Sequence, residues 1–303
     1  MIVGCGDVGL RVLRLLLPRW RVLALTSSPE RMPLLRALGA VPLWGDLDQP
    51  ASLGRLGGLA DSVLHLAPPP AQGTTDARTR SLLHALARGG TVQHLVYCST
   101  SGVYGDCQGQ WVPETRGVQP LSDRAWRRVD AEAHVRLFGR QTGARVSVLR
   151  VPGIYGLDRP GGNPAERLAR HTPALRAQDD VFTNHIHADD LARACMLALW
   201  RGRAQRTYNV SDDTELKMGD YYDAAADLYG LPRPPRVPRS TAADALPLML
   251  LSFMSESRRL LNARMKRELR LSLRYPTVLD GLRAGVLAGA QAAPPGAVTR
   301  PTA

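Results

Sequence analysis

The sequence predicts an α/β protein built on a doubly wound parallel sheet, with a small lobe added toward the C-terminus. Short apolar runs alternate with segments of helical period from the first residue to about residue 156. A glycine-rich turn joins the first apolar run to the first helical segment, and three consecutive prolines, Pro68 to Pro70, end the fourth run. Strands and helices that alternate at this spacing form βαβ units with right-handed crossovers. The sheet is therefore expected to be parallel, with helices on both faces.

The expected elements follow one another regularly along the first half. The apolar runs predict strands at residues 1–3, 21–28, 40–46, 62–70, 92–101 and 144–152. The segments between them predict helices at about residues 7–17, 29–39, 77–90 and 122–142. The first strand is shorter than the roughly five residues of a typical strand. Either this strand is truncated or the chain starts farther upstream.

The rhythm changes after residue 156. Helical segments at 163–170, 188–201, 218–229 and 240–270 are separated by short extended pieces and by the proline-rich linker 231–240. We expect residues 1–156 to form the sheet domain and residues 157–285 to form the smaller lobe. Residues 286–303 are rich in proline and alanine, and they are expected to form a disordered tail.

Composition narrows the classes of partner. The 303 residues have a formal net charge of +12, but only Lys217 and Lys266 are lysines, and the arginines are spread over helical faces. This favours a solvated basic surface over a nucleic-acid footprint. The most apolar later stretch, 246–254, is too short to span a bilayer. The four cysteines lack metal-ligand spacing and suit reduced thiols. We expect a cytoplasmic protein with no metal, no nucleic-acid partner and no membrane segment.

The first turn has the pattern G-x-G-x-x-G, formed by Gly4, Gly6 and Gly9. The pattern alone is weak, but here it follows an expected strand and opens an expected helix. Gly4 permits the tight turn, Gly6 lets the backbone approach a pyrophosphate, and Gly9 lets the helix pack closely on the strand. The helix N-terminus adds free N–H groups and the positive end of the helix dipole. We therefore expect the turn to bind a nicotinamide dinucleotide.

The end of the second strand bears on which dinucleotide is bound. An acidic residue at this place holds the ribose 2′-hydroxyl of NAD. Thr26 occupies the place here, Ser27 follows it, and Arg31 lies nearby. Hydroxyls and an arginine suit a 2′-phosphate better, although the residue directly after Thr26 is not an arginine. NADP is therefore the expected cofactor, with NAD as the alternative. The same residues can also cap the helix that begins at Pro29.

Five motifs in order resemble the extended short-chain dehydrogenase/reductase superfamily, in its NAD-dependent epimerase/dehydratase branch. They are GCGDVG (4–9), GDL (45–47), CSTSGVYG (98–105), LRVPGIYG (149–156) and HIHADDLARA (185–194). An atypical bacterial subgroup is the most similar, because it shares the APPP segment and the stretch SRRLLNARMKREL. The resemblance covers about residues 1–285 and implies a Rossmann-like fold. The cofactor-binding residues expected from the turn and the resemblance are Gly4, Gly6, Asp7, Val8, Gly9, Thr26, Ser27, Arg31, Asp46, Leu47, Ala67, Pro68, Arg128 and Pro152.

The resemblance also implies a catalytic set, and the sequence departs from it. In the superfamily a Ser or Thr orients the substrate oxygen, a Tyr is the general acid/base, and a Lys lowers the pKa of that Tyr and bonds the nicotinamide ribose. The hydroxyl role falls on Thr100. Glu132 matches the family's acidic residue four positions after the Lys. This register assigns Arg124 to the place of the Tyr and Arg128 to the place of the Lys.

The two arginines change the expected chemistry. A guanidinium cannot release a proton near neutral pH, so Arg124 cannot act as the acid/base. Arg128 can still bond ribose hydroxyls and supply a positive charge. One helical turn apart, the two can form an anion clamp, which implies an anionic substrate. The alternative is that both are ordinary solvent-facing arginines. Tyr104 is the alternative acid/base, although relatives use the matching residue mostly for packing.

The stretch from Asn184 to Asp190 gathers two histidines and two carboxylates. The resemblance implies that these residues cap the next helix and tie the lobe to the sheet, rather than binding a metal. Asp189 or Asp190 is the expected N-cap. Asn184 is expected to point toward the substrate.

The expected function is an NAD(P)-dependent oxidoreductase or an epimerase/dehydratase of the sugar-nucleotide type, acting on a small molecule between the sheet edge and residues 156–285. The alternative is a cofactor-binding sensor or assembly protein without turnover, which the missing Tyr/Lys pair favours. RNA binding is a third option, and only the basic charge supports it. A monomer or a homodimer is expected, because the helix at 122–142 is a dimer surface in many relatives.

Overall fold

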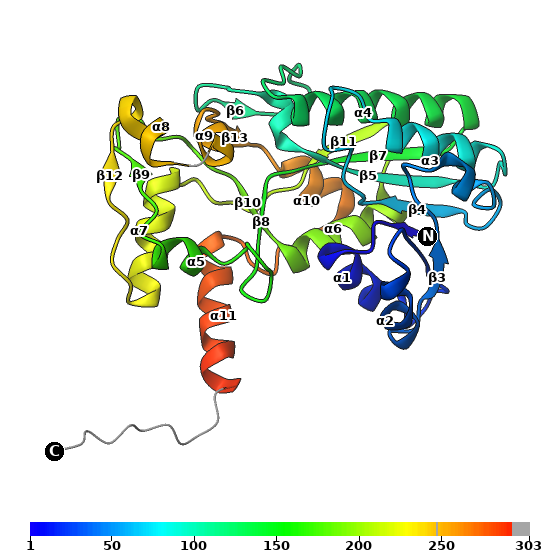
Figure 1. The fold of residues 1–303 in the computed structure, drawn as a ribbon, viewed down its shortest axis with the longest axis horizontal. Helices are drawn as coiled ribbons and strands as arrows, with labels where there is room; N and C mark the ends of the chain where they lie inside the picture. Colours follow the sequence, from blue (N-terminus) through cyan, green and yellow to red (C-terminus); the bar gives the residue numbers. More distant parts are fainter. Residues whose placement is uncertain (247, 293–303) are drawn as a thin grey trace.

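The computed structural model describes residues 1–246 and 248–292 and shows a seven-stranded sheet with a lobe at one end (Figure 1). The strand order is β11-β7-β5-β4-β1-β2-β3, and every neighbouring pair is parallel. The chain winds away from β1 in both directions. The strand order therefore reverses between β1 and β4, where doubly wound sheets bind their ligands. The predicted fold class is confirmed.

The strands of the sheet are β1 (Ile2–Val3), β2 (Leu23–Thr26), β3 (Val41–Trp44), β4 (Ser62–His65), β5 (His94–Thr100), β7 (Arg145–Val151) and β11 (Arg206–Asn209). Three smaller parallel pairs are β8 (Gly153–Tyr155) with β10 (His185–His187), β9 (Ala174–Leu175) with β12 (Arg236–Val237), and β6 (Trp111–Val112) with β13 (Arg259–Leu260). The helices are α1 (Asp7–Leu16), α2 (Met32–Ala37), α3 (Ala77–Ala87), α4 (Asp123–Thr142), α5 (Pro164–Ala169), α6 (Ala188–Arg201), α7 (Met218–Tyr229), α8 (Ala242–Ala245), α9 (Leu248–Met254), α10 (Ala263–Leu269) and α11 (Val278–Ala292). Short 3-10 helices are η1 (Pro29–Arg31), η2 (Pro50–Leu53), η3 (Ser101–Tyr104) and η4 (Arg239–Thr241).

Helices cover both faces of the sheet (Figure 1). On one face α3 and α4 bury Leu82 and Val135 against the side chains of the strands. On the other face α1 and α6 bury Val12 and Leu191. Both cores consist mainly of leucine, valine and alanine, as a chain with few aromatic residues requires. Burial of these side chains is the main source of the sheet domain's stability.

The central strand β1 is only two residues long, yet it is paired on both sides. Ile2 and Val3 are each 1% exposed. The Val3 carbonyl also accepts the N–H groups of Leu66 and Ala67, at 2.8 and 3.0 Å. These bonds extend the contact between β1 and the segment after β4, so the short strand still fixes the glycine turn that follows it.

Two elements from the second half of the chain join the sheet domain. Helix α6 packs on α1 over the sheet, and β11 adds to the sheet edge beside β7. Both elements lie inside the interval 157–285 that the sequence assigns to the lobe. Their apolar faces complete the core of the sheet domain, so the chain crosses between the two parts several times. The lobe itself contains α5, α7, α8, α9, β9 and β12 (Figure 1).

The helix expected over 240–270 is interrupted. It is divided into α8, α9 and α10, with strand β13 between the last two. Strand β13 pairs with β6, and the Leu260 N–H donates to Asn184 Oδ1 at 2.8 Å. These long-range partners override the local helical pattern, which contains no information about them.

Helix α11 runs to Ala292, beyond the boundary at which the sequence places a disordered tail. The first part of this helix is held by its apolar face, because Val278 and Leu282 are fully buried against the lobe. The rest of the expected tail, 293–303, lies outside the described residues. No helix in the described ranges is both long enough and apolar enough to cross a membrane.

Candidate cofactor and substrate site

The glycine turn has the geometry of a phosphate cradle. Gly4 has a φ of +85°, and a Cβ there would lie 2.5 Å from the Ala67 nitrogen. At Gly9 a Cβ would lie 3.0 Å from the Gly4 oxygen, so this glycine permits the close contact of α1 with the turn. At Gly6 a Cβ would meet no atom within 4 Å. Space is therefore open at the one glycine where a pyrophosphate is expected, directly at the N-terminus of α1. The turn fits a bound dinucleotide diphosphate.

The other two expected residues of the turn have different surroundings. Val8 is partly buried and packs against the core beneath α1. Asp7 lies in the first turn of α1 and accepts from Arg159 Nη1 at 2.6 Å. Its other oxygen accepts from Arg11 Nε at 3.2 Å. The carboxylate of Asp7 is therefore already engaged by two guanidinium groups beside the cradle.

Crossing ion pairs connect the turn to the loop that follows β8. Arg11 of α1 binds Asp158 at 2.7 Å, and Arg159 of the loop binds Asp7. The stem of Arg159 lies over Gly162, where a Cβ would be only 2.9 Å from Arg159 Cδ. We call Asp7, Arg11, Asp158 and Arg159 the α1 clasp. Sequence reasoning missed Arg11 and Arg159, because no local pattern distinguishes them among the many arginines.

The end of β2 presents hydroxyls and one arginine. Thr26 Oγ1 accepts the Ser28 N–H at 3.2 Å, which fixes the turn into η1, and Ser27 is exposed. Arg31 Nη2 donates to the Cys5 carbonyl at 2.8 Å. Burial raises the pKa of the Cys5 thiol to about 11, although the charge of Arg31 opposes this shift. The Arg31 guanidinium is therefore held between the β2 end and the glycine turn.

Further residues expected to bind the cofactor follow β3, on the adenine side, and β4, on the nicotinamide side. Asp46 accepts the Asp48 N–H at 3.0 Å, so its carboxylate holds its own turn. Leu47 packs against the buried core beneath it. Ala67 is 8% exposed and contacts Gly4, and the Pro68 carbonyl accepts from Arg78 at 3.3 Å. These residues lie at the carboxyl ends of the strands next to the cradle.

A cavity of about 1040 Å³ lies at the carboxyl edge of the sheet, between the sheet and the lobe. Thr100, Pro152 and Arg124 line it from the sheet side. Five arginines line the cavity in all, against two glutamates: Arg124, Arg159, Arg167, Arg170 and Arg258 against Glu166 and Glu256. Guanidinium groups in excess of carboxylates give the cavity a positive potential, which favours anionic ligands.

Thr100 and Arg124 are the predicted catalytic residues that meet in this cavity. Thr100 ends β5, and its Oγ1 accepts the Gly102 N–H at 3.2 Å, which leaves the hydroxyl proton free to donate. Ser122 caps α4 and thereby places Arg124 in the first turn of that helix. Desolvation lowers the pKa of Arg124, the Glu256 carboxylate opposes this, and the guanidiniums nearby lower it further. A guanidinium remains charged despite such shifts.

Arg128 and Tyr104 point elsewhere. Arg128 Nη1 donates to Tyr97 Oη at 3.0 Å and to the Cys98 carbonyl at 2.9 Å, and Arg128 is not part of the cavity wall. Tyr104 is fully buried and donates its hydroxyl to Asn209 at 2.8 Å. Burial raises the pKa of Tyr104. Its hydroxyl therefore neither lines the cavity nor ionises readily, and this geometry gives no support to Tyr104 as the alternative acid/base.

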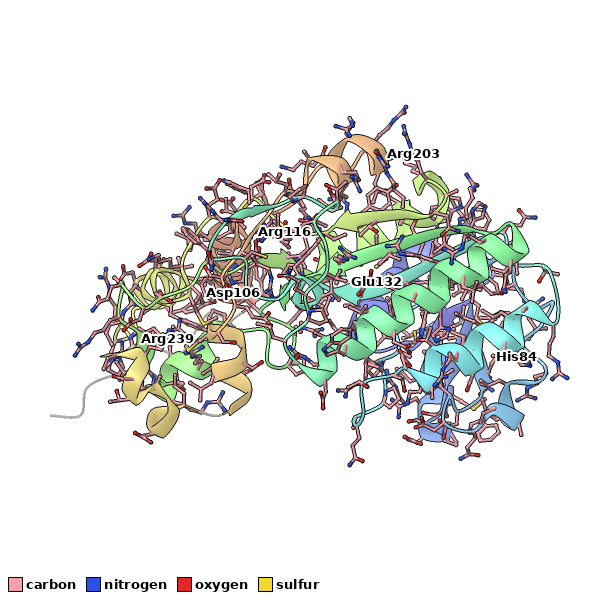
Figure 2. All side chains as sticks on the ribbon, turned by 90° about the horizontal axis from the view of Figure 1, so that it is seen from above. His84, Asp106, Arg116, Glu132, Arg203 and Arg239 are labelled. Atoms are coloured by element: carbon pink, nitrogen blue, oxygen red, sulfur yellow. The ribbon has the colours of Figure 1, made fainter. Side chains whose placement is uncertain are left out.

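Glu132, which sets the sequence register, belongs to a buried ion pair beneath the site. It lies on the side of α4 that faces the sheet (Figure 2). Arg150 of β7 donates to both of its oxygens, at 3.1 and 2.7 Å, and Ser99 Oγ donates at 2.7 Å. Glu132 and Arg150 are 4% and 5% exposed. This pair joins α4 to β5 and β7 directly below Thr100, and sequence reasoning did not identify it.

The segment from Asn184 to Asp190 has structural roles that differ in detail from expectation. The N-cap of α6 is His187, whose Nδ1 accepts the Asp189 N–H at 3.1 Å, and not an aspartate. Asp190 accepts the N–H groups of Arg274 and Tyr275, both at 2.9 Å. Asp190 thus ties α6 to the segment before α11, as the resemblance implies.

Asn184 lines the cavity, but its amide is partly occupied. Its Nδ2 donates to the Arg258 carbonyl at 2.9 Å and its Oδ1 accepts from Leu260. Asn184 therefore positions the segment that carries Arg258, while its second Nδ2–H can still donate to a ligand in the cavity. Within the described ranges no group of three or more His, Cys, Asp or Glu residues is arranged to hold a metal ion.

Comparisons with known proteins agree with this geometry. The NAD dependent epimerase/dehydratase family matches residues 1–211. A ketoreductase of Stigmatella aurantiaca that acts on 4-hydroxy-2-methyl-3-oxo-4-farnesyl-3,4-dihydroquinoline-1-oxide is 26% identical over 75% of this chain and 72% of its own.

Two solved structures share the fold over nearly the whole chain. A conserved protein of unknown function from Silicibacter pomeroyi DSS is 30% identical, with a TM-score of 0.77 over 95% of this chain and 98% of its own. The dTDP-glucose 4,6-dehydratase DesIV of Streptomyces venezuelae, solved with NAD bound, is 21% identical, with a TM-score of 0.76 over 96% and 97%. The sheet order, the glycine turn and the family match together place this chain in the NAD-dependent epimerase/dehydratase family of the extended short-chain dehydrogenase/reductases.

Proposed function

We propose that the protein is an NAD(P)-dependent oxidoreductase or epimerase/dehydratase whose substrate is a small anionic molecule. The observation that supports this best is the cavity with five arginines and two glutamates, next to a turn that is open at Gly6. The turn fits a dinucleotide, and the charge of the cavity fits an anion beside it. The similar ketoreductase and the NAD-bound dehydratase support hydride chemistry on a carbonyl or hydroxyl group.

The residues of this chain divide the work as follows. A nicotinamide dinucleotide bound in the turn would supply or accept a hydride. Thr100 donates a hydrogen bond to the substrate oxygen, because its hydroxyl proton is uncommitted and faces the cavity. Arg124 attracts the anionic group of the substrate and stabilises negative charge that develops near it. Arg128 keeps a permanent positive charge at β5, where the ribose is expected. Arg124 and Arg128 occupy the places of the family's Tyr and Lys but cannot transfer a proton, so the proton that accompanies the hydride comes from water or goes to water in the cavity.

The proposed cofactor is NADP. The end of β2 has no carboxylate to repel a 2′-phosphate, and Arg31 is held beside it. We expect Arg31→Ala to weaken NADPH binding by about 10-fold or more, since hydrogen bonds to charged groups contribute about 1.5–3 kcal/mol. NADH binding should change little. Titration calorimetry measures both, with Arg36→Ala on the exposed side of α2 as the control. Equal losses for the two cofactors would assign Arg31 to the diphosphate instead.

The role of Arg124 is tested by Arg124→Ala. We expect the KM for an anionic substrate to rise by about 10- to 100-fold, because a charge-assisted contact is lost, while NADPH affinity stays the same. Arg124→Lys should recover part of the loss. Arg140→Ala, on the exposed C-terminal part of α4, is the matched control. Unchanged kinetics in Arg124→Ala would show that Arg124 is an ordinary surface arginine.

The second candidate function is cofactor binding without turnover, as in a sensor or assembly protein. The burial of Tyr104 favours it, because it removes the nearest substitute for the missing tyrosine. Titration with NADPH and NADH, followed by hydride-exchange assays on a panel of carbonyl compounds and sugar nucleotides, separates the two. Tight cofactor binding with no hydride exchange on any compound would establish the second function.

A further inference from the structure

His185 lies at the cavity, on a strand that extends the sheet edge into the lobe. Strand β10 pairs with β8 in parallel, with His185 opposite Gly153. Strand β8 follows directly after Pro152, and Val151 pairs with Thr100. His185, Gly153, Pro152 and Thr100 all line the cavity. Continuous pairing therefore places the imidazole on the same wall as the hydroxyl that is proposed to contact the substrate.

The surroundings of His185 keep its ring neutral. The residue is 7% exposed, and its ring packs 4.5 Å from the Tyr221 ring, with Tyr155 edge-on at 6.3 Å. Burial lowers the pKa of His185 to about 4. An imidazole with such a pKa is uncharged near neutral pH, so His185 differs in kind from the arginines that line the same cavity.

The hydrogen bonding of His185 is incomplete. Its Nδ1 is buried and has no partner among the described residues. A neutral imidazole has one N–H and one lone pair, and a buried orphan N–H is rarer than an unsatisfied acceptor. The lone pair is therefore assigned to Nδ1 and the proton to Nε2. The Cδ2 atom of His185 is bonded to Nε2 in the ring. It lies 4.0 Å from the position that a Cβ on Gly153 would take, and Gly153 lines the cavity.

Two other histidines show that this arrangement is specific. His65 also has an unpaired Nδ1, but its Nε2 is bonded to Thr79 at 2.9 Å and it does not line the cavity. His187 also has a hydrogen-bond partner, because its Nδ1 accepts the Asp189 N–H and caps α6. Of the three, His185 alone combines cavity exposure, burial above nine-tenths and a ring without a hydrogen-bond partner within the described ranges.

We propose that His185 is a substrate-binding residue, which donates its Nε2–H to an oxygen of an anionic, oxygen-rich ligand held in this cavity. The inference rests on the proposed function and names a contact that the function does not require. Arginines recognise the charged group of the ligand, whereas a neutral donor recognises a carbonyl or hydroxyl oxygen without adding charge. The arginines of the cavity thus bind the charged group of the ligand, and His185 binds one of its uncharged oxygens.

Chemical labelling tests the geometry without requiring a known substrate. Diethyl pyrocarbonate acylates the lone-pair nitrogen of a neutral imidazole, and peptide mass spectrometry locates the product. In the unliganded protein the imidazole proton exchanges between the two nitrogens through water, so the cavity-side Nε2 of His185 also carries the lone pair part of the time. We expect His185 to be modified, His84 on the outer face of α3 to be modified as well (Figure 2), and the buried His65, whose Nε2 is bonded to Thr79, to stay unmodified. With NADPH present, inorganic pyrophosphate or dTDP-glucose should protect His185 and leave His84 reactive. An unreactive His185, or one that neither probe protects, overturns the proposal.

Variants test the hydrogen bond itself. His185→Phe keeps a ring and loses the donor, whereas His185→Gln keeps a donor. Titration calorimetry of the protecting probe should show a loss of about 3- to 10-fold for His185→Phe and less for His185→Gln, the range for one neutral hydrogen bond. NADPH affinity should be unchanged in both, with His84→Gln as the control. Equal probe affinity in His185→Phe and the parent also refutes the contact. A lack of hydride exchange on every compound would refute the proposed function alone and leave the labelling and binding results standing.

Discussion

Gly4→Ala is expected to unfold the protein far more readily than Gly6→Ala, although the two glycines are only two positions apart. An alanine at position 4 would place its Cβ 2.5 Å from the Ala67 nitrogen, at a φ of +85°. A side chain in the left-handed region costs about 1–2 kcal/mol, and overpacking adds about 1–3 kcal/mol. We therefore expect the free energy of unfolding to fall by about 2–5 kcal/mol, measured by urea denaturation.

Gly6→Ala is the matched comparison, because its added Cβ meets no atom within 4 Å and its φ is −77°. Its stability should stay close to that of the parent. Its affinity for NADPH should nevertheless fall by at least about 10-fold, since the methyl group occupies the space where the diphosphate approaches the backbone. Normal NADPH binding by Gly6→Ala would show that the turn is not the phosphate site. A stability loss as large as that of Gly4→Ala would show that Gly6 is packed in the apo protein.

Glu132→Ala should cost about 3–5 kcal/mol of stability, the range for removing one partner of a buried ion pair. The cost arises because Arg150, 5% exposed, loses its only carboxylate partner among the described residues and keeps its charge in the core. Glu132→Gln retains an acceptor for Ser99 and should lose less. Replacing both residues, as in Glu132→Leu with Arg150→Met, should restore part of the stability, because no charge is then buried.

The exposed pair Asp227–Arg233 is the control for this experiment. Its two side chains are 54% and 61% exposed, so Asp227→Ala should cause no measurable change in urea denaturation. If Glu132→Ala lost no more stability than Asp227→Ala, water would have to reach the Glu132–Arg150 pair freely. The pair would then have no role in fixing α4 against the strands below Thr100.

The glycine turn and the alternation of strands and helices could be predicted from the sequence, because both are local. The G-x-G-x-x-G spacing shows in a few residues, and each strand of the sheet except β11 has its own apolar run. The break of 240–270 into three helices could not be predicted. It depends on the pairing of β13 with β6 and on the hydrogen bond to Asn184, whose partners lie far away along the chain.

The site was predictable in part for the same reason. Thr100 and Arg124 meet in one cavity, as expected from their places after β5 and at the start of α4. The separation of Arg128 from the cavity depends on which way its side chain turns, and a helical register alone cannot give that direction. The partner of the Tyr104 hydroxyl could not be predicted, because Asn209 lies on β11, a strand absent from the expected sheet domain.

The α1 clasp has a consequence for how the two ligand sites communicate. Arg159 lines the substrate cavity and at the same time binds Asp7 in the turn that is proposed to hold the cofactor. A ligand that displaces Arg159 at one site must therefore alter an ion pair at the other. Such a link is reciprocal by thermodynamic necessity: whatever factor the substrate imposes on cofactor affinity, the cofactor imposes on substrate affinity. Because the residues of the α1 clasp are partly exposed, salt will weaken this coupling. The cooperativity between cofactor and substrate binding therefore depends on ionic strength as well as on the fold.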